Sequence, residues 1–178
     1  MRCVFMYGPV ASGKLTVATA VNTITGLPVF HNHYAIDAAL SLFEFGSLGF
    51  VRLRELIWLS AFREAALAGR SFIFTFNPEA SVPPTFIGAA TTAFESAGGT
   101  VLYVSLACSE AVIESRISAS SRSQYGKLTS VEQYRLLRNS GAFTFAPLPS
   151  PHLLINTDSV SPEDAARQIQ NLLAGRAA

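Results

Sequence analysis

The sequence of 178 residues contains few charged side chains, and neither sign of charge dominates. Asp, Glu, Lys and Arg make up 14% of the chain, and 13 basic residues against 12 acidic ones give a net charge of +1. Such a balance argues against nucleic acid or an anionic membrane as a partner, because both attract proteins with a basic surface. Any recognition of phosphate must therefore depend on a local arrangement of residues.

Cysteines and long apolar runs are scarce as well. Cys3 and Cys108 have no metal-ligand spacing, so we expect two reduced thiols in the core. The longest apolar stretch, residues 34–51, is interrupted by Asp37 and Glu44 and does not predict a transmembrane helix. The N-terminal apolar run ends at once in a glycine-containing loop, unlike a cleavable signal sequence, which favours a cytoplasmic protein.

Apolar residues, by contrast, are plentiful and make up 49% of the chain. This is enough to build a large core, and we expect one domain over residues 1–178. Short β-rich runs alternate with helical patterns, and this alternation predicts a parallel sheet with helices on both faces. The expected strands cover residues 2–7, 28–31, 71–76, 100–106 and 152–156. The expected helices cover residues 13–25, 34–45, 50–68 and 84–97, a segment capped by Ser109, residues 130–139, and a last helix starting at Ser161. In such sheets, ligands bind beyond the carboxyl ends of the strands.

The most informative segment lies directly behind the first expected strand. It reads Gly8-Pro9-Val10-Ala11-Ser12-Gly13-Lys14-Leu15-Thr16, a Gly-x-x-x-x-Gly-Lys pattern that runs into a helical stretch. Such a loop binds phosphates because its glycines let backbone N–H groups approach, its lysine supplies a positive charge, and a helix N-terminus faces the anion. We therefore predict that residues 8–16 bind a nucleoside triphosphate and that Lys14 contacts its phosphates.

The magnesium-binding part of this pattern is altered. Leu15 stands where Ser or Thr usually holds Mg²⁺, and the hydroxyl comes one residue later, so we assign the metal contact to Thr16. The third expected strand ends in Asn77-Pro78-Glu79, without the usual carboxylate directly at the strand end. Mg²⁺ would then be held by Thr16 with waters and phosphate, or with indirect help from Glu79.

Polar residues follow the second expected strand. We expect Asp37 to lie half-buried near a helix start, where it orients or deprotonates an acceptor hydroxyl; the alternative is a first-turn acid that complements the helix dipole. His31 and His33 are expected to bind the substrate or to pack, since no third ligand for a metal is evident. Arg52 and Arg54 are expected on a solvated helix face, with acceptor binding as the alternative.

Two further groups are candidates for nucleotide contacts. Arg116 lies beside the apolar stripe of the helix after the fourth strand, and a Ser-rich stretch with Arg122 follows it. We predict a mobile flap at about 118–128 that closes over the phosphates, with Arg122 stabilising charge on the transferred phosphoryl group; the alternative is a solvated loop. Asp158, after the fifth strand, either contacts the purine ring or caps the next turn.

These residues resemble the small P-loop kinases of the nucleoside-monophosphate-kinase and shikimate-kinase type, and more distantly the chloramphenicol phosphotransferases. The resemblance spans the chain in length and element order and is specific at residues 8–16. It implies an α/β three-layer P-loop NTPase fold with a five-stranded parallel sheet in the order 2-3-1-4-5. It also implies ATP with Mg²⁺ as donor, flap arginines at Arg116 and Arg122, and an acceptor pocket that contains Asp37.

The sequence thus predicts an ATP-dependent phosphotransferase that moves the γ-phosphate to a hydroxyl of a small molecule. His31-Asn32-His33 stands where shikimate-like kinases have an acidic pair, and Asn77-Pro78-Glu79 stands where they have two glycines, so shikimate is not the expected acceptor. Two other functions stay open: a regulatory or vestigial nucleotide-binding protein without transfer activity, and a slow nucleoside triphosphatase.

Overall fold

The computed structural model describes residues 1–118, 128–145 and 147–175. Its strands are β1 (Arg2–Tyr7), β2 (Val29–His31), β3 (Phe72–Phe76), β4 (Thr100–Ala107) and β5 (Leu153–Asn156). All of them pair in parallel, in the order β2-β3-β1-β4-β5. The predicted sheet order is therefore confirmed. Tyr7 at the end of β1 lies opposite Phe76 at the end of β3 and Ser105 of β4, so β1 and β3 end level and β4 extends two residues further.

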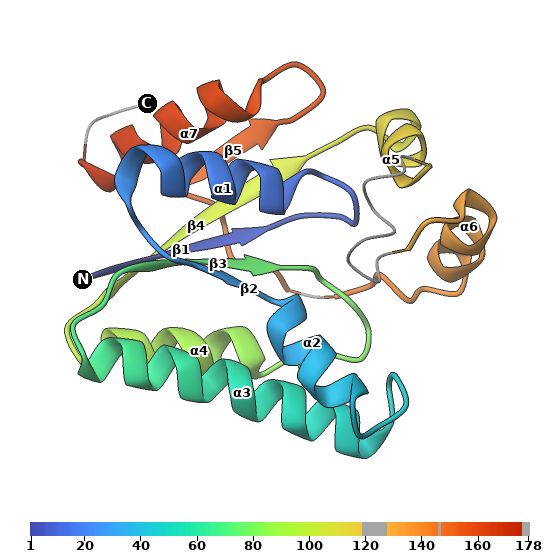
Figure 1. The fold of residues 1–178 in the computed structure, drawn as a ribbon, viewed down its shortest axis with the longest axis horizontal. Helices are drawn as coiled ribbons and strands as arrows, with labels where there is room; N and C mark the ends of the chain where they lie inside the picture. The colour runs from blue at the N-terminus through green and yellow to red at the C-terminus, as the bar shows by residue number, and fades with distance from the viewer. Residues whose placement is uncertain (119–127, 146, 176–178) are drawn as a thin grey trace.

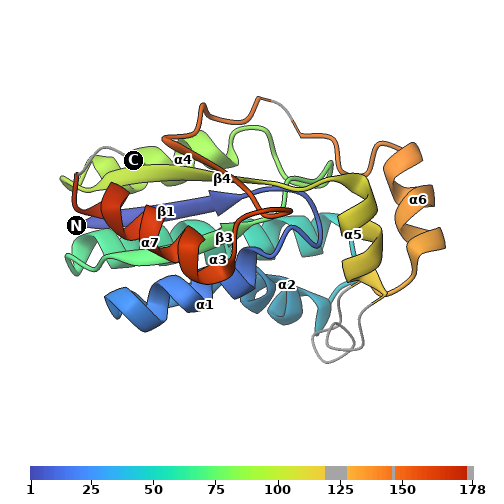
Figure 2. The same cartoon turned by 90° about the horizontal axis from the view of Figure 1, so that it is seen from above.

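The helices form a layer on each face of this sheet. They are α1 (Lys14–Thr25), α2 (His33–Leu40), α3 (Leu48–Leu67), α4 (Phe86–Glu95), α5 (Glu110–Ile117), α6 (Val131–Asn139) and α7 (Pro162–Leu173). Helices α1 and α7 cover one face and α3 and α4 the other (Figure 1). Helices α5 and α6 lie beyond the carboxyl ends of the strands (Figure 2). Among the described helices, none combines the length and apolar composition that crossing a bilayer requires.

Local sequence signals set most helix ends. Helix α1 begins after Gly13 and stops at Gly26, whose left-handed backbone (φ 72°) lets its N–H reach the Asn22 carbonyl oxygen. Helix α7 begins at Pro162 and is capped by Ser161, whose hydroxyl accepts the Asp164 N–H, as the Ser-Pro sequence predicts.

The helix expected over residues 34–45 is shorter than predicted. It begins one residue earlier, at His33, and ends at Leu40. Gly46 takes a left-handed conformation (φ 77°), and the Ser47 hydroxyl then accepts the Phe50 N–H and starts α3. The turn and the cap together separate two helices in a stretch whose apolar composition alone does not mark a break.

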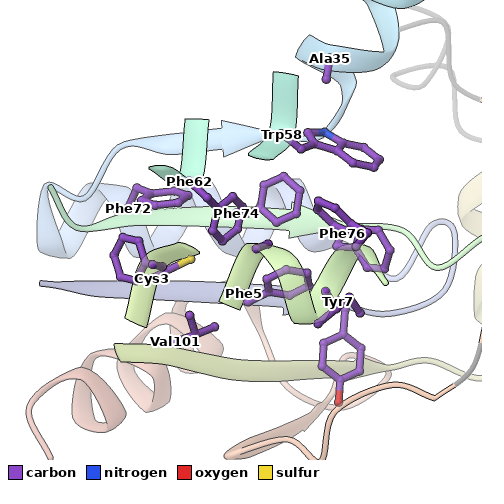
Figure 3. Packing of buried hydrophobic residues seen from close by; sticks show 14 of the residues in the cluster. Cys3, Phe5, Tyr7, Ala35, Trp58, Phe62, Phe72, Phe74, Phe76 and Val101 are labelled. Carbon is purple, nitrogen blue, oxygen red and sulfur yellow. The ribbon is translucent and has the colours of Figure 1, made fainter. Parts of the chain in front are cut away.

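The two faces of the sheet carry different cores. Because side chains alternate along a strand, β1 directs Cys3, Phe5 and Tyr7 to one side and Val4 and Met6 to the other. The first side is rich in aromatic rings from β1, β3, α3 and α4, and several pairs of these rings meet edge to face (Figure 3). The second side is filled by smaller residues of α1 and α7. The aromatic packing holds α3 firmly against the sheet.

We predict that Phe74 is a principal stabilising residue of this core. Its ring centroid lies 5.1 Å from that of Phe5, 5.2 Å from that of Phe62 and 6.0 Å from that of Trp58, and the side chain is fully buried. Phe74→Ala should lower the free energy of unfolding by about 3–5 kcal/mol, and Phe74→Leu by less than half of that. Urea titrations followed by circular dichroism measure both, and a loss below about 1 kcal/mol for Phe74→Ala would contradict the prediction.

Candidate active site

The loop between β1 and α1 is folded tightly against the edge of the sheet. A Cβ atom at Gly8 would collide with the Leu106 carbonyl oxygen, so this position has no room for a side chain. Ala11 and Gly13 both have left-handed backbone angles (φ 59° and 87°), and the Ser12 N–H donates to the Pro9 carbonyl oxygen at 3.2 Å. The chain thereby curls back before α1 begins.

The first turn of α1 has no cap. Gly13 has no side chain to supply one, and the first helical hydrogen bond runs from the Val17 N–H to the Gly13 carbonyl oxygen at 3.0 Å. In the described part of the chain, the N–H groups of Gly13, Leu15 and Thr16 have no hydrogen-bond acceptor. All three residues line a cavity. Uncapped donors at the start of a twelve-residue helix fit a phosphate group.

The Lys14 side chain lies across this loop. Its ammonium group donates to the carbonyl oxygens of Gly8 (2.8 Å) and Pro9 (2.6 Å) and reaches the Asn77 side-chain oxygen at 3.3 Å. The loop and the end of β3 thus hold the charge beside the uncapped N–H groups, as the sequence predicts for a lysine that contacts phosphates.

Arg116 of α5 also reaches the loop, through a residue that the sequence does not single out. Its guanidinium donates to the Thr157 hydroxyl (3.0 Å) and carbonyl (2.6 Å) and lies 3.4 Å from the Ala11 carbonyl oxygen. The Thr157 hydroxyl in turn donates to the Ser12 carbonyl oxygen at 3.1 Å. Thr157, which is nearly buried, therefore ties the phosphate loop to the arginine of α5.

A cavity of about 1030 Å³ runs along this edge of the sheet. We divide its lining into a loop half and an α2 half. The α2 half comprises His31, Asn32, His33, Ile36, Asp37, Leu40, Phe45, Trp58, Thr75, Asn77 and Glu79. The loop half comprises residues 10–17, Thr19, Ala20, Thr23, Arg116, Leu128, Thr157, Val160, Pro162 and Glu163. The structure thus brings the predicted phosphate loop, Arg116, both histidines and Asp37 to one cavity.

Within the α2 half, the two histidines lie together. The Nδ1 atom of His31 accepts the His33 N–H at 3.0 Å, and the two rings meet edge to face with centroids 4.9 Å apart. Asp37 lines the cavity, but it is exposed rather than half-buried, and it is the fifth residue of α2. The expectation of a half-buried acid is wrong because Ala35 and Ala39 form the buried face of α2, and Asp37, two residues from each, lies on the opposite side of the helix.

The metal-binding candidates are oxygen atoms spread along the cavity. Thr16 is exposed in the first turn of α1, and Asn77 occupies the strand end where a carboxylate is usual. Among residues 1–118, 128–145 and 147–175, no cluster of three or more His, Cys, Asp or Glu side chains is placed to hold a metal ion. The donors present fit a magnesium ion held mostly by waters and phosphate oxygens, since Mg²⁺ usually keeps several waters.

Arg54 is not on a solvated face, contrary to expectation. It is fully buried, forms an ion pair with Glu79, and donates to the Ser81 hydroxyl (3.1 Å) and carbonyl (2.9 Å). The Phe50 and Trp58 rings flank its guanidinium at 4.9 and 4.8 Å. Burial lowers the pKa of Arg54, and the Glu79 carboxylate opposes that shift.

The spacing of α3 contains the signal for this burial. Phe50, Arg54, Trp58, Phe62 and Ala66 recur every four residues and are the buried positions of the helix. An arginine in the middle of such a stripe faces the core and needs a buried partner. Arg52, two residues before Arg54, is exposed, as expected for a residue on a solvated helix face.

The two remaining predicted site residues are Asp158 and Arg122. The exposed Asp158 carboxylate accepts the Ser109 N–H at 3.0 Å, and hydrogen bonds from Ser109 lower the pKa of Asp158. It does not line the cavity, so the structure shows it bracing the start of α5. Arg122 and most of the predicted flap lie outside the described residues.

Comparison with known proteins identifies the fold. No protein-family model and no curated protein matches the sequence. Among solved structures, the chain is similar to a sugar kinase from Janibacter sp. HTCC2649, with 18% identity and a TM-score of 0.67 over 98% of this chain and 95% of that one. It is similar to the APS kinase of Mycobacterium tuberculosis in complex with AMPPNP and APS, with 16% identity and a TM-score of 0.67 over 97% of each chain. It is also similar to a tunicamycin resistance protein of Deinococcus radiodurans, with 18% identity and a TM-score of 0.59 over 99% of this chain and 96% of that one. The chain has the fold of the small P-loop kinases. At such identities the likeness establishes the fold alone.

We predict that the left-handed conformation of Gly13 is needed for nucleotide binding. Gly13→Ala should strain the loop and turn its N–H groups away, which weakens ATP binding at least about tenfold. Gly26→Ala is the matched control, because it imposes the same strain at the other end of α1, where an added Cβ meets nothing. Both variants should lose about 1–2 kcal/mol of stability, measured by urea titration. Calorimetric ATP titration should separate them, and equal affinities would contradict the prediction.

Proposed function

We propose that this protein is an ATP-dependent phosphotransferase that moves the γ-phosphate of ATP to a hydroxyl group of a small molecule. The observation that carries the proposal is the arrangement of charge around one cavity. Uncapped helix N–H groups, Lys14 and Arg116 lie in the loop half, and the Asp37 carboxylate lies in the α2 half. A phosphate donor and a hydroxyl acceptor require these two environments side by side.

In this proposal, the loop half binds the triphosphate. The N–H groups of Gly13, Leu15 and Thr16 and the Lys14 ammonium contact the β- and γ-phosphates, and Arg116 adds positive charge beside the loop. The Thr16 hydroxyl holds Mg²⁺ together with waters, and the ion, when bound, neutralises charge on the phosphate oxygens. Arg122 is proposed to approach the transferred group.

The α2 half binds the acceptor. Asp37 accepts the proton of the acceptor hydroxyl as its oxygen attacks the γ-phosphorus, and the bond from that phosphorus to the bridging oxygen of ADP breaks. The products are ADP and the phosphorylated acceptor, and the proton passes from Asp37 to solvent. His31 and His33 orient the acceptor by hydrogen bonding. Positioning and charge neutralisation supply most of the rate enhancement.

Two features favour a second candidate, a nucleotide-binding protein without transfer activity. Leu15 replaces a magnesium-binding hydroxyl, and Asn77 replaces a strand-end carboxylate. ATP binding without ADP formation, across a panel of hydroxylated acceptors, would favour this candidate. Phosphate release that is independent of any acceptor would instead identify a slow triphosphatase.

Lys14→Met should abolish phosphoryl transfer, with a loss of at least about a hundredfold in the rate of ADP formation, because it removes the only lysine of the phosphate loop. Arg63→Met is the matched control, since that side chain is exposed on α3 and pairs with the adjacent Glu64. A coupled assay for ADP, run over the acceptor panel, measures both. An active Lys14→Met enzyme would refute the proposed phosphate site.

Asp37→Asn should lower turnover about 10²–10⁴-fold while leaving ATP affinity unchanged, because the amide binds the acceptor hydroxyl but takes no proton from it. Glu44→Gln is the control, an exposed acid in the segment after α2 that does not line the cavity. Steady-state kinetics and ATP titration separate the two effects. Equal losses of turnover and ATP affinity, or no loss of either, would exclude Asp37 as the base.

A further inference from the structure

One face of α2 lines the cavity. It consists of residues three or four positions apart, which share one side of a helix: His33, Ile36, Asp37 and Leu40. Asp37 and Leu40 are neighbours on this face, because three residues advance a helix by about 4.5 Å. A molecule that brings a hydroxyl group to the Asp37 carboxylate therefore meets an apolar side chain directly beside that group.

The turn between α2 and α3 adds Phe45 to the same wall of the cavity (Figure 1). The Phe45 ring packs against that of the fully buried Phe50, with centroids 4.8 Å apart. Directly after it, Gly46 turns the chain in a left-handed conformation, and the Ser47 cap starts α3. The ring is thus anchored on a buried side chain, although 59% of Phe45 is exposed.

Leu40 and Phe45 leave apolar surface open to solvent inside the cavity. Leu40 is 46% exposed, and the half-buried Ile36 lies one helical turn before it. Leu42, in the same turn as Phe45, is 71% exposed but is not among the described residues that line the cavity. Apolar side chains that border a polar site favour a ligand with an apolar portion, since binding removes their surface from water.

We propose that Leu40 and Phe45 form a subsite for an apolar portion of the acceptor, located next to the hydroxyl group that Asp37 receives. The acceptor is thus an amphipathic hydroxyl compound, a polyol with an alkyl or aryl substituent, and not a bare polyol or an unsubstituted sugar. This inference rests on the proposed phosphotransferase function and narrows it. It concerns the apolar portion alone and applies whatever charge the rest of the acceptor carries.

The probes are 1,2-butanediol, 1,2-hexanediol and 1,2-octanediol, which share the same two hydroxyl groups and differ only in the length of the alkyl chain. The full-length protein is titrated with each diol in the presence of a non-hydrolysable ATP analogue, and ligand-detected NMR measures the dissociation constants. Each added methylene group should raise the affinity about twofold, because the wall covers one side of it. Octanediol should therefore bind about sixteenfold more tightly than butanediol.

Phe45→Ser and Leu40→Ser should each reduce that ratio to less than about fourfold. Two variants are needed because Phe45 also packs on Phe50, whereas Leu40 is the last residue of α2. Leu42→Ser is the matched control and should leave the ratio unchanged, since it removes an exposed apolar side chain outside the cavity lining. Affinities that do not depend on chain length, or a dependence that neither Phe45→Ser nor Leu40→Ser reduces, would overturn the inference.

Sedimentation velocity distinguishes an acceptor subsite from an interface between copies of this chain. A dimer that both Phe45→Ser and Leu42→Ser dissociate would assign the exposed side chains to such an interface and would also overturn the inference. Because the diol titration does not measure transfer, a dependence on chain length without ADP formation would contradict only the proposed function.

Discussion

The start of α1 carries backbone N–H groups that a helix cannot satisfy by itself, and the rest of the site depends on leaving them uncapped. Most helices cover these donors with a Ser, Thr, Asp or Asn side chain, as α3, α6 and α7 do here. At α1 the capping position is Gly13, which has no side chain and takes a left-handed conformation. The protein thus has no stabilising side-chain cap at the helix start that follows the loop, and the donors stay accessible to an anion.

Such a loop needs support from elsewhere, and the support comes from residues distant in the sequence. Gly8 packs against the carbonyl oxygen of Leu106, and Thr157 binds the Ser12 carbonyl oxygen. A small apolar cluster of α5 and α6, including Ile113 and Tyr134, also contacts the outer side of the loop. The loop is therefore packed directly against α5, the helix that carries Arg116.

The sequence predicts those parts of the structure that depend on local spacing. The loop sequence, the Gly26 stop and the Ser161 cap follow from residues close together in the chain, whereas the strand order was implied by the resemblance to small P-loop kinases. Thr157 could not be found in this way, because its partners lie 145 and 41 residues away. Arg54 could have been found, since it continues the four-residue spacing of Phe50 and Trp58, but charged residues on a helix usually face solvent and that expectation prevailed.

Asp37 shows a different limit of sequence analysis. Its apolar neighbours in the chain suggested burial, but the buried face of α2 is formed by Ala35 and Ala39, and Asp37 lies about 200° from each around the helix axis. The start at His33 rather than one residue later is coupled to the hydrogen bond between its N–H and the His31 ring. The hydrophobic periodicity of a sequence does not predict a contact of this kind between a strand end and a helix start.

The charges that line the cavity are unevenly distributed. Lys14 and Arg116 lie at the loop, and the exposed acids are Asp37 on α2 and Glu163 at the start of α7. Glu79 contributes less, because its ion pair with the buried Arg54 largely neutralises its charge at the boundary of the cavity. In the proposed function, Lys14 and Arg116 therefore place the triphosphate over the loop, and repulsion by the Asp37 carboxylate keeps the phosphates away from the α2 half.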